Sequence, residues 1–525
     1  MARAMAGVMT GDPSPRARWL GVLGIVVVAG LLRLWHLELR PPHHDEGVNG
    51  WFVERMLTSG AYTYDPANYH GPTYFYLLAA SRALFGFGLW QLRLPGALIG
   101  VALCLVPLLA RRRLGWGAAL AACALLATSP TLVYYARDAI HETLFAGLGL
   151  VVAACVLRWA DGGRAAWVIA AAAALASMIA TKETTILFLA VGGAWLLAEV
   201  VVESRRARRL VVLGHAVRVS WRLAVVGALA LAVMAAIHVL LFTGFLQARG
   251  SIGGQLHNSI KAYLVWTKTG TGHGGHVKGG GYYLHLAVRY ELVLYALAAI
   301  GAATAWRERW VRGPAVVGFG LCGAYSAIAY KMPWLPMSWL VLLALPAGRG
   351  VVALGGLARG RHAGQVARAA LALASVPALI IATRVAFVRP ADRREALAYV
   401  HTDADYNRWF PLIEAAARQR GRGRVIVAVD HPAQWPLAWS LSRYPRTRWY
   451  VAGTEDVIVV AASRADATEA RLRSAYLRGD IMVRDASEPA RIYLRRAVFD
   501  RLLSSAEKRG YVPIAPAVVQ AAQLD

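Results

Sequence analysis

Charged residues are scarce in this 525-residue chain, and acidic residues are scarcest. Asp, Glu, Lys and Arg make up 17% of the sequence and hydrophobic residues 57%, whereas an ordinary soluble protein carries about 25% charged residues. The 30 acids face 57 basic residues, which gives a formal net charge of +27. This balance excludes an acidic disordered chain and most soluble classes. It does not by itself indicate nucleic acid, because cytoplasmic loops of membrane proteins are also basic.

Motifs for metals and nucleotides are also missing. The four cysteines each lie inside an apolar run, without a Cys-x-x-Cys pair or Cys/His metal spacing, so we expect small buried core residues. No Walker motif or dinucleotide fingerprint is present, and the glycine-rich stretch Gly270–Gly281 lacks the strand–loop–helix context of a phosphate loop. We therefore predict no protein-bound metal and no certain cofactor, and leave a divalent cation open.

Long apolar runs are what the sequence does contain. A helix needs about 20 apolar residues to cross a bilayer, and about eleven runs approach this length. The first, Trp19–Leu34, follows Arg16 and Arg18 and precedes no clear cleavage site, so we expect it to stay as the first span. We predict a mainly α, polytopic transmembrane protein with candidate spans 19–36, 93–110, 116–131, 143–159, 165–181, 184–202, 220–245, 287–306, 312–330, 334–352 and 366–388.

The basic clusters predict the orientation, because Lys and Arg gather in cytoplasmic loops. The clusters at 111–113, 205–209, 307–312 and 359–361 all fall inside only if residues 73–88 form a membrane-surface helix. The outer side then receives a first loop, 37–92, with interfacial helices, a second polar segment, Tyr134–Glu142, and a long loop, 246–286.

The tail, residues 389–525, has a different composition from the membrane domain, residues 1–388. It holds 16 of the 30 acids. This composition predicts a small, soluble, extracytoplasmic α/β or α+β domain. In it, Trp435, Trp439 and His431 beside Asp430 indicate either a surface for an acceptor or glycan, or a packed core. The predicted strands are 425–429, 457–461 and 481–483, and the predicted helices are 395–400, 412–418 and 497–509.

Two adjacent acids, Asp45 and Glu46, follow Pro41-Pro42 at the predicted exit of the first span. Neighbouring carboxylates point in different directions on most backbones, so we expect different roles for them. One reading is a general base beside an orienting acid. The other is a helix N-terminus, where acids suit the cap and the dipole.

The second outer segment carries Arg137, Asp138 and Glu142, and Lys182-Glu183 ends a later span at the same predicted depth. Asp138 and Glu142 are four residues apart and share a helix face. Arg137 could pair with an acid of the first loop or hold a phosphate. The alternatives are a solvated helix end and an interface anchor.

The predicted outer loop 246–286 contains no acid, although it carries several basic residues and histidines. A flexible, glycine-rich, basic loop can fold over an anionic phosphate. Two histidines with weak metal spacing, His273 and His276, lie within it. Lys331 could also face a lipid phosphate, beside aromatic residues typical of an interfacial belt. The loop's basic residues are Arg249, Lys261, Lys268 and Lys278.

Several short motifs follow one another along the chain. They are Asp45-Glu46, Trp51, Gly71 to Leu77, Arg93-Leu94-Pro95, Ser129-Pro130 and Tyr135-Ala136-Arg137-Asp138. In this order they resemble the GT-C glycosyltransferases, in the branch of protein mannosyltransferases and aminoarabinose transferases. Further motifs are His44-Asp45-Glu46, Thr181-Lys182-Glu183, Tyr330 to Trp334 and Trp435 to Trp439. These are similar to a subfamily named flippase-activity-associated glycosyltransferase-like proteins.

The resemblance implies transfer of a sugar from a polyprenyl-phosphate donor to an unidentified acceptor hydroxyl, in a bacterial or archaeal-type cytoplasmic membrane, at its outer face. It implies that Asp45 is the catalytic acidic residue, which acts as a carboxylate base, and that Glu46 is the neighbouring acid. A phosphate leaving group needs cations and one base, so inversion is expected. The alternative is a lipid-linked saccharide flippase or a flippase-associated scaffold; no nucleic-acid partner is expected. The expected phosphate ligands are Arg137, Lys182, Lys331 and Lys278, and the expected substrate-contacting or orienting residues are His44, Asp138, Glu142, Glu183, Tyr74 and Trp334.

Overall fold

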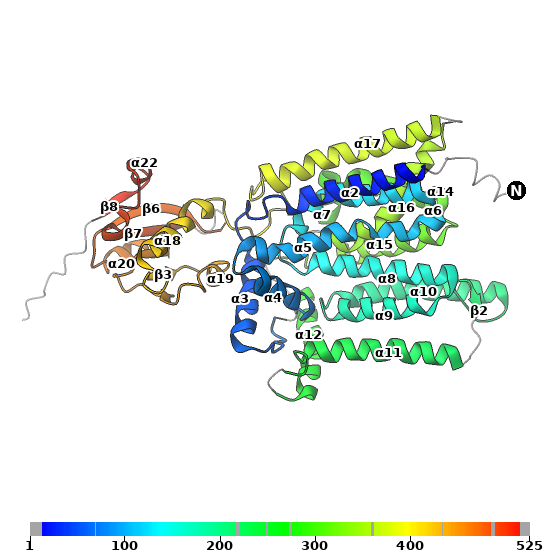
Figure 1. The fold of residues 1–525 in the computed structure, drawn as a ribbon, viewed down its shortest axis with the longest axis horizontal. Coiled ribbons are helices and arrows are strands. Elements are labelled where there is room, and N and C mark those ends of the chain that lie inside the picture. Colours follow the sequence, from blue (N-terminus) through cyan, green and yellow to red (C-terminus); the bar gives the residue numbers. More distant parts are fainter. Residues whose placement is uncertain are drawn as a thin grey trace, which may run out of the picture. The chain divides into compact units, whose positions relative to one another are not determined.

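The structure, a computed structural model, describes residues 13–68, 70–216, 221–247, 250–271, 276–358, 362–432, 434–484 and 489–514. The chain forms two compact units (Figure 1). The helical unit contains residues 1–37 and 53–388, and the C-terminal unit contains residues 38–52 and 389–525. One helix, α3 (His44–Ser59), begins in the C-terminal unit and ends in the helical unit.

Each of the eleven predicted spans overlaps at least one helix of the helical unit, and the exact number of membrane crossings stays a prediction. In the part of the chain that the structure describes, eight helical runs are long and apolar enough to cross a membrane. The elements are α2 (Pro15–Leu34), α4 (Thr73–Phe85), α5 (Leu89–Leu103), α6 (Arg111–Thr128), α7 (Pro130–Ala136), α8 (Glu142–Gly162), α9 (Ala165–Ile179), α10 (Thr185–Ala207), α11 (Trp221–Phe242), α14 (Leu292–Ala305), α15 (Arg309–Ala327), α16 (Met337–Gly355) and α17 (His362–Thr383).

The core of the helical unit lies around α16, which packs against α6, α14 and α15. Glycines let these backbones approach closely, as is common between membrane helices. A Cβ added to Gly350 on α16 would lie 2.1 Å from the Leu297 carbonyl oxygen of α14, and one on Gly348 would lie 2.2 Å from the Ala118 carbonyl oxygen of α6. Larger residues at either glycine would force the helices apart.

Three of the basic clusters lie at one end of this unit. Arg309 is paired with Glu203 beyond the middle of α10, and Arg113 is paired with Asp161 near the end of α8. The helix α4, within the predicted surface segment 73–88, has 13 residues, which is too short to cross a bilayer. Which side of the membrane this end faces stays a prediction.

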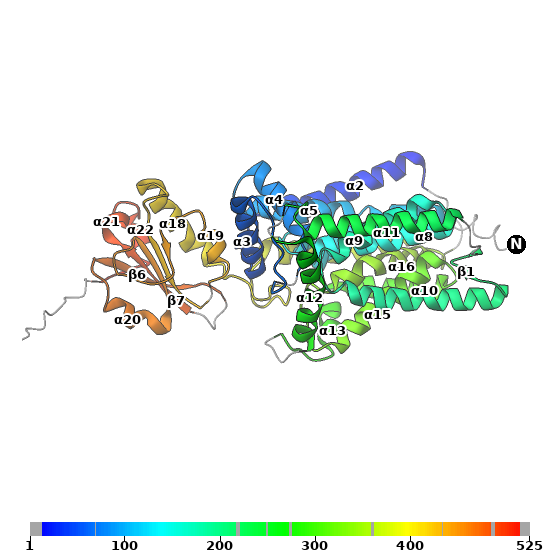
Figure 2. The ribbon, with the colours of Figure 1, turned by 90° about the horizontal axis from the view of Figure 1, so that it is seen from below.

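The stretch 246–286 was predicted as a flexible loop, and this is wrong for most of its described residues. It contains α12 (Ile252–Thr271) and α13 (Tyr282–Leu286). Figures 1 and 2 show α12 running crosswise to α11. Its buried residues, Gln255, Ser259, Ala262 and Trp266, recur at helical spacing and form one stripe, a pattern that the glycines and basic residues obscure. Arg249 and His273 lie outside the described residues.

The C-terminal unit is built on a six-stranded sheet of order β4-β3-β5-β7-β6-β8. Strands β3, β4 and β5 are parallel, and β5, β7, β6 and β8 are antiparallel neighbours. Figure 2 shows α18 and α20 on opposite faces of the sheet. The strands are β3 (Val427–Asp430), β4 (Thr447–Arg448), β5 (Val457–Ala461), β6 (Tyr476–Met482), β7 (Pro489–Arg495) and β8 (Val512–Ile514), and the helices are α18 (Tyr406–Arg420), α19 (Leu437–Ser440), α20 (Ala465–Glu469), α21 (Arg496–Phe499) and α22 (Ser505–Lys508).

Two helices predicted in the tail are wrong. Residues 395–400 form turns, in which the Ala398 N–H donates to the Glu395 carbonyl three residues back at 2.9 Å. Residues 497–509 are divided between α21 and α22, because Ser504 caps the second helix in a capping box. The predicted strand 457–461 coincides with β5, and the predicted strand 425–429 overlaps β3.

Candidate functional site

Several predicted site residues gather in the helical unit, where a turn joins α9 to α10. The segment before α4 packs against this turn through its main chain. The Gly71 N–H donates to the Thr181 carbonyl at 3.1 Å, and the Thr73 N–H donates to the Ala180 carbonyl at 3.0 Å. A Cβ on Gly71 would lie 2.2 Å from the Ala180 oxygen, so this approach requires glycine. It places His70 beside the turn.

Two ion pairs link the turn to its neighbours. His70 Nδ1 lies 3.1 Å from Glu183 Oε2, and the Lys182 ammonium donates to the carboxylate of Glu142, the first residue of α8. The side chains of Glu183, Lys182 and Glu142 are buried. Burial alone would lower the pKa of Lys182, but the charges of Glu142 and Glu183 outweigh it and raise that pKa. Lys182 therefore carries a positive charge at neutral pH.

His141 lies against this cluster and extends it. Its ring centroid is 4.7 Å from that of His70 and 5.2 Å from that of Tyr74 on α4. Burial lowers the pKa of His141 well below its ordinary value, and the nearby His70 and Lys182 lower it further, so the ring is neutral. Among the described residues, His141 Nε2 and Glu183 Oε1 are buried without a hydrogen-bond partner.

Sequence reasoning did not select His70 and His141 as site residues. The available signal was their position, since His70 directly precedes Gly71 and His141 directly precedes Glu142. Neither position predicts that two segments about 70 residues apart would bring their imidazole rings into contact, tilted by 45°. Within the described ranges, no three His, Cys, Asp or Glu side chains gather as a metal site.

Arg137, a predicted phosphate ligand, lies at the C-terminal end of α2. Its Nη1 donates to the Trp35 carbonyl at 2.7 Å, and its Nη2 donates to the His36 carbonyl at 2.7 Å. Its guanidinium carbon is 4.4 Å from the ring centroid of Phe387. The guanidinium thus satisfies carbonyls that a helix end leaves open, and the neighbouring Asp138 is buried. A phosphate contact by Arg137 stays a prediction.

Lys278 and Lys331, predicted from separate segments, lie together. An isolated antiparallel bridge joins their two segments, and Lys278 Nζ donates to the Lys331 carbonyl at 3.0 Å. The Lys331 ammonium donates to the Ile328 carbonyl. Trp334, which closely follows Lys331 in the sequence, is buried. It packs edge-on against Tyr135, with ring centroids 5.9 Å apart. These contacts give both lysines structural partners within the helical unit.

The adjacent acids Asp45 and Glu46 lie in the first turn of α3, in the C-terminal unit. Glu46 Oε2 accepts the His43 N–H at 2.8 Å, and His43 Nδ1 accepts the Asp45 N–H at 3.1 Å. This reciprocal pattern resembles a capping box. Within the described residues of this unit, the Asp45 carboxylate has no hydrogen-bond or ion-pair partner. The Glu46 carboxylate therefore caps the helix start, whereas the Asp45 carboxylate does not. His44, between His43 and Asp45 in the sequence, is half-buried.

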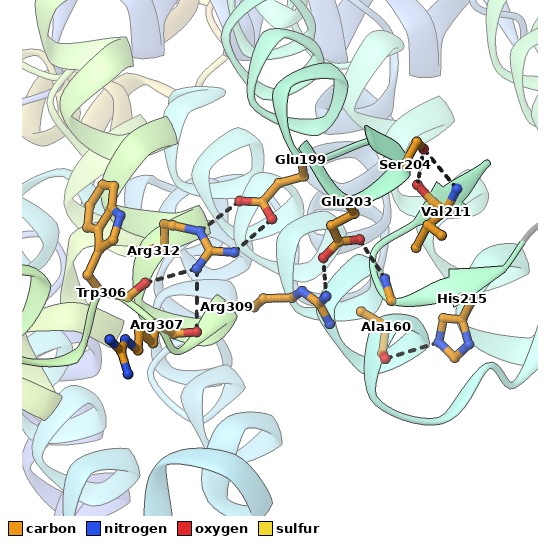
Figure 3. Close-up of polar contacts among 11 residues, drawn as sticks. Ala160, Glu199, Glu203, Ser204, Val211, His215, Trp306, Arg307, Arg309 and Arg312 are labelled. Carbon is orange, nitrogen blue, oxygen red and sulfur yellow. Dashed lines mark hydrogen bonds and ion pairs between the residues drawn. The ribbon is translucent and has the colours of Figure 1, made fainter. Parts of the chain in front are cut away.

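A second group of ion pairs lies toward the other end of α10 (Figure 3). Arg312 binds Glu199 through two hydrogen bonds of 2.7 Å. Glu203 accepts from Arg309 and from the Gly214 N–H. Both oxygens of each carboxylate are thus occupied. Sequence reasoning treated these basic residues as an orientation signal, and the structure gives them acidic partners.

Comparison with known proteins agrees with the motifs. Residues 69–238 match the family model described as dolichyl-phosphate-mannose-protein mannosyltransferase. A structure of ArnT from Cupriavidus metallidurans bound to undecaprenyl phosphate is similar, with a TM-score of 0.59 and 18% identity, over 92% of this chain and 98% of that chain. No curated protein sequence matches the chain.

Two further solved structures share the fold. The Archaeoglobus fulgidus oligosaccharyltransferase, in complex with Zn and sulfate, has a TM-score of 0.51 and 12% identity, over 87% of this chain and 72% of that one. The arabinofuranosyltransferase AftD from Mycobacteria has a TM-score of 0.50 and 15% identity, over 93% of this chain and 40% of that one. The chain is thus a multi-pass membrane protein with the fold of the GT-C glycosyltransferases. The predicted resemblance to the mannosyltransferase and aminoarabinose transferase branch is confirmed.

Proposed function

We propose that this protein is a glycosyltransferase that moves a sugar from a polyprenyl-phosphate donor to an acceptor hydroxyl at the outer membrane face. The observation that carries the proposal is the buried charged cluster around Lys182 and Glu183, which lies wholly within the segment that matches the mannosyltransferase family. Buried charges next to membrane helices are costly and usually functional. The similar ArnT was solved with undecaprenyl phosphate, which supports a lipid phosphate as the leaving group.

The proposed reaction is a single displacement. The Asp45 carboxylate takes the proton of the acceptor hydroxyl, the acceptor oxygen bonds to the anomeric carbon, and the bond from that carbon to the phosphate oxygen breaks. The polyprenyl phosphate leaves with the bonding electrons, so it needs positive charge rather than a proton. Lys182, whose pKa is raised by Glu142 and Glu183 despite burial, supplies such a charge. Backside attack inverts the anomeric configuration.

The surrounding residues take supporting roles in this proposal. Glu183 has one engaged and one open oxygen, so it suits a sugar hydroxyl as acceptor. Neutral His141 has an open nitrogen of its own. Tyr74 packs against the His141 ring and helps to hold it. Glu142 keeps Lys182 charged and in place.

The proposal is tested in proteoliposomes that contain the purified protein, with a polyprenyl-phosphate sugar labelled in the sugar. Release of polyprenyl phosphate and appearance of labelled product are measured with a panel of hydroxyl acceptors. We expect Asp45→Asn to lower turnover by about 10²–10⁴-fold, the usual contribution of a positioned base, with donor binding unchanged. Asp466→Asn, at an exposed acid of the C-terminal unit, is the matched control and keeps wild-type turnover. Normal turnover by Asp45→Asn contradicts the role of Asp45.

The same vesicles distinguish transfer from transport. A flippase would move labelled lipid-linked saccharide across the bilayer without releasing polyprenyl phosphate. Equal movement in the wild type and in Asp45→Asn, with no released phosphate in either, would replace the transferase with that function.

A further inference from the structure

The segment that carries Asp45 is folded into the C-terminal unit, although some 350 residues separate the two in sequence. Thr402 Oγ1 donates to the Pro42 carbonyl at 2.5 Å, and Asn407 Nδ2 donates to the Leu39 carbonyl at 3.1 Å. His43 Nε2 lies 2.9 Å from the Tyr399 carbonyl oxygen. These contacts fix the chain on the N-terminal side of α3.

The first turns of α3 also lie in close contact with the tail's Trp-Pro-Leu-Ala-Trp segment. A Cβ on Gly47 would lie 2.5 Å from Pro436 Cα, and a Cβ on Gly50 would lie 2.6 Å from the Trp439 ring. Trp439 is buried, which accords with the packed-core reading of this segment. Real Cβ atoms do not approach other atoms so closely, so both positions require glycine. One face of α3 is therefore shaped to fit this segment.

The helix start is thereby held from two directions. His43 is bound to the tail through its Nε2 and caps α3 through its Nδ1. Glu46 completes the cap by accepting the His43 N–H. Asp45 lies in this capped first turn, so these contacts and the glycine face fix the main chain that carries its carboxylate.

We propose that the C-terminal unit is a positioning module, which holds the N-terminal turns of α3 and thereby orients Asp45. Gly50, Trp439 and Asn407 are positioning residues, because they act on Asp45 only through α3. The link to catalysis rests on the proposed function, whereas the link to α3 does not. A displacement of about 1 Å in a reacting group can cost about 100-fold in rate.

The test compares Gly50→Ala with the double variant Gly50→Ala/Trp439→Leu in the full-length protein. We expect Gly50→Ala to lower kcat by about 100-fold with the donor KM within about twofold, since the donor cations belong to the helical unit. The smaller Leu reopens the space, so the double variant recovers at least about tenfold relative to Gly50→Ala. Gly24→Ala on α2 is the control, because a Cβ there meets nothing within 4 Å. A Gly50→Ala variant with wild-type kcat overturns the proposal.

Hydrogen exchange of backbone amides provides a readout that does not depend on sugar transfer. Gly50→Ala should speed exchange of residues 44–52 and leave β5 and β7 at wild-type rates. Equal acceleration in those strands would show plain destabilisation and overturn the proposal. The milder Asn407→Ala removes one exposed hydrogen bond and should give the same pattern, with a severalfold loss of kcat. A wild type without transfer activity removes the proposed function, while the exchange pattern still decides whether the C-terminal unit holds α3.

Discussion

The helix α10 has acids near both of its ends, and the two groups differ in how their oxygens are used. Glu183, just before its first residue, has one oxygen on His70 and one without a partner among the described residues. Glu199 and Glu203, in its second half, have both oxygens occupied. At 1.5 Å per residue the ends are roughly 30 Å apart. The two ends of α10 therefore differ in whether a carboxylate oxygen is left open, and not in the presence of charged pairs.

Burial separates the two groups as well. Lys182 and Glu142 are each 6% exposed in their side chains, whereas Arg312 and Arg309 are 21% and 32% exposed. A partly exposed pair is solvated and contributes little stability. A buried pair has lost its water and leaves a charge uncompensated when one partner is removed. Desolvation of the charged groups at the start of α10 therefore costs more free energy than that of the pairs in its second half.

The largest expected effect is on the Lys182–Glu142 pair. Glu142→Gln leaves the buried ammonium without its closest counter-charge and should lower the free energy of unfolding by about 3–5 kcal/mol. Glu199→Gln, at the other end of α10, should cost about 1 kcal/mol or less. Both are measured by denaturant unfolding in the same detergent. Equal losses would remove the distinction between the two ends.

Next comes the open oxygen of Glu183. Glu183→Gln preserves shape but replaces a charged acceptor, and should lower kcat/KM for sugar transfer by about 100-fold, with little loss of stability. Glu203→Gln has the same chemistry at the other end and should leave transfer unchanged. Comparable transfer defects in the two variants would contradict the assignment of the site to the start of α10.

A smaller effect is expected from Gly71→Ala. The added Cβ meets backbone at Ala180, which cannot rotate away, so overpacking should cost about 1–3 kcal/mol and disturb the His70–Glu183 pair. Gly162→Ala on α8 meets nothing within 4 Å and serves as the control, with stability equal to the wild type or slightly above it. Thermal unfolding of both variants checks this expectation. A Gly71→Ala variant that unfolds at the wild-type temperature would show that the turn accommodates the added Cβ without overpacking.

The smallest expected effect is a pH dependence from His141. Its folded-state pKa lies below the unfolded value of about 6.5 because of burial, His70 and Lys182. The unfolded chain therefore binds more protons, and stability is full above about pH 6.5 and falls as the pH drops below it. Unfolding measured from pH 8 to pH 5 should show this slope, and His141→Asn should flatten it. A slope that persists unchanged in His141→Asn would assign it to other groups.

Hydrophobic length and composition were sufficient to predict the mainly helical membrane fold and a small sheet-containing domain in the tail. They could not predict that Lys182 pairs with Glu142 or that His70 meets Glu183, because those contacts join segments 40 and 113 residues apart. The contacts of Arg137 could not be predicted for a different reason. Its partners are main-chain carbonyls at the end of α2, which leave no pattern in the sequence. The placement of residues 38–52 with the tail depends on Gly47 and Gly50 fitting Pro436 and Trp439, which only the fold reveals.

The two ends of α10 are expected to differ in whether they bind the lipid phosphate. This is tested by a cryo-EM map of the protein in nanodiscs with polyprenyl phosphate added. We predict phosphate density within hydrogen-bonding distance of Lys182, and none at Arg309 or Arg312 beyond that seen without the ligand. Phosphate density at Arg309 or Arg312, with none near Lys182, would contradict a phosphate site at the start of α10.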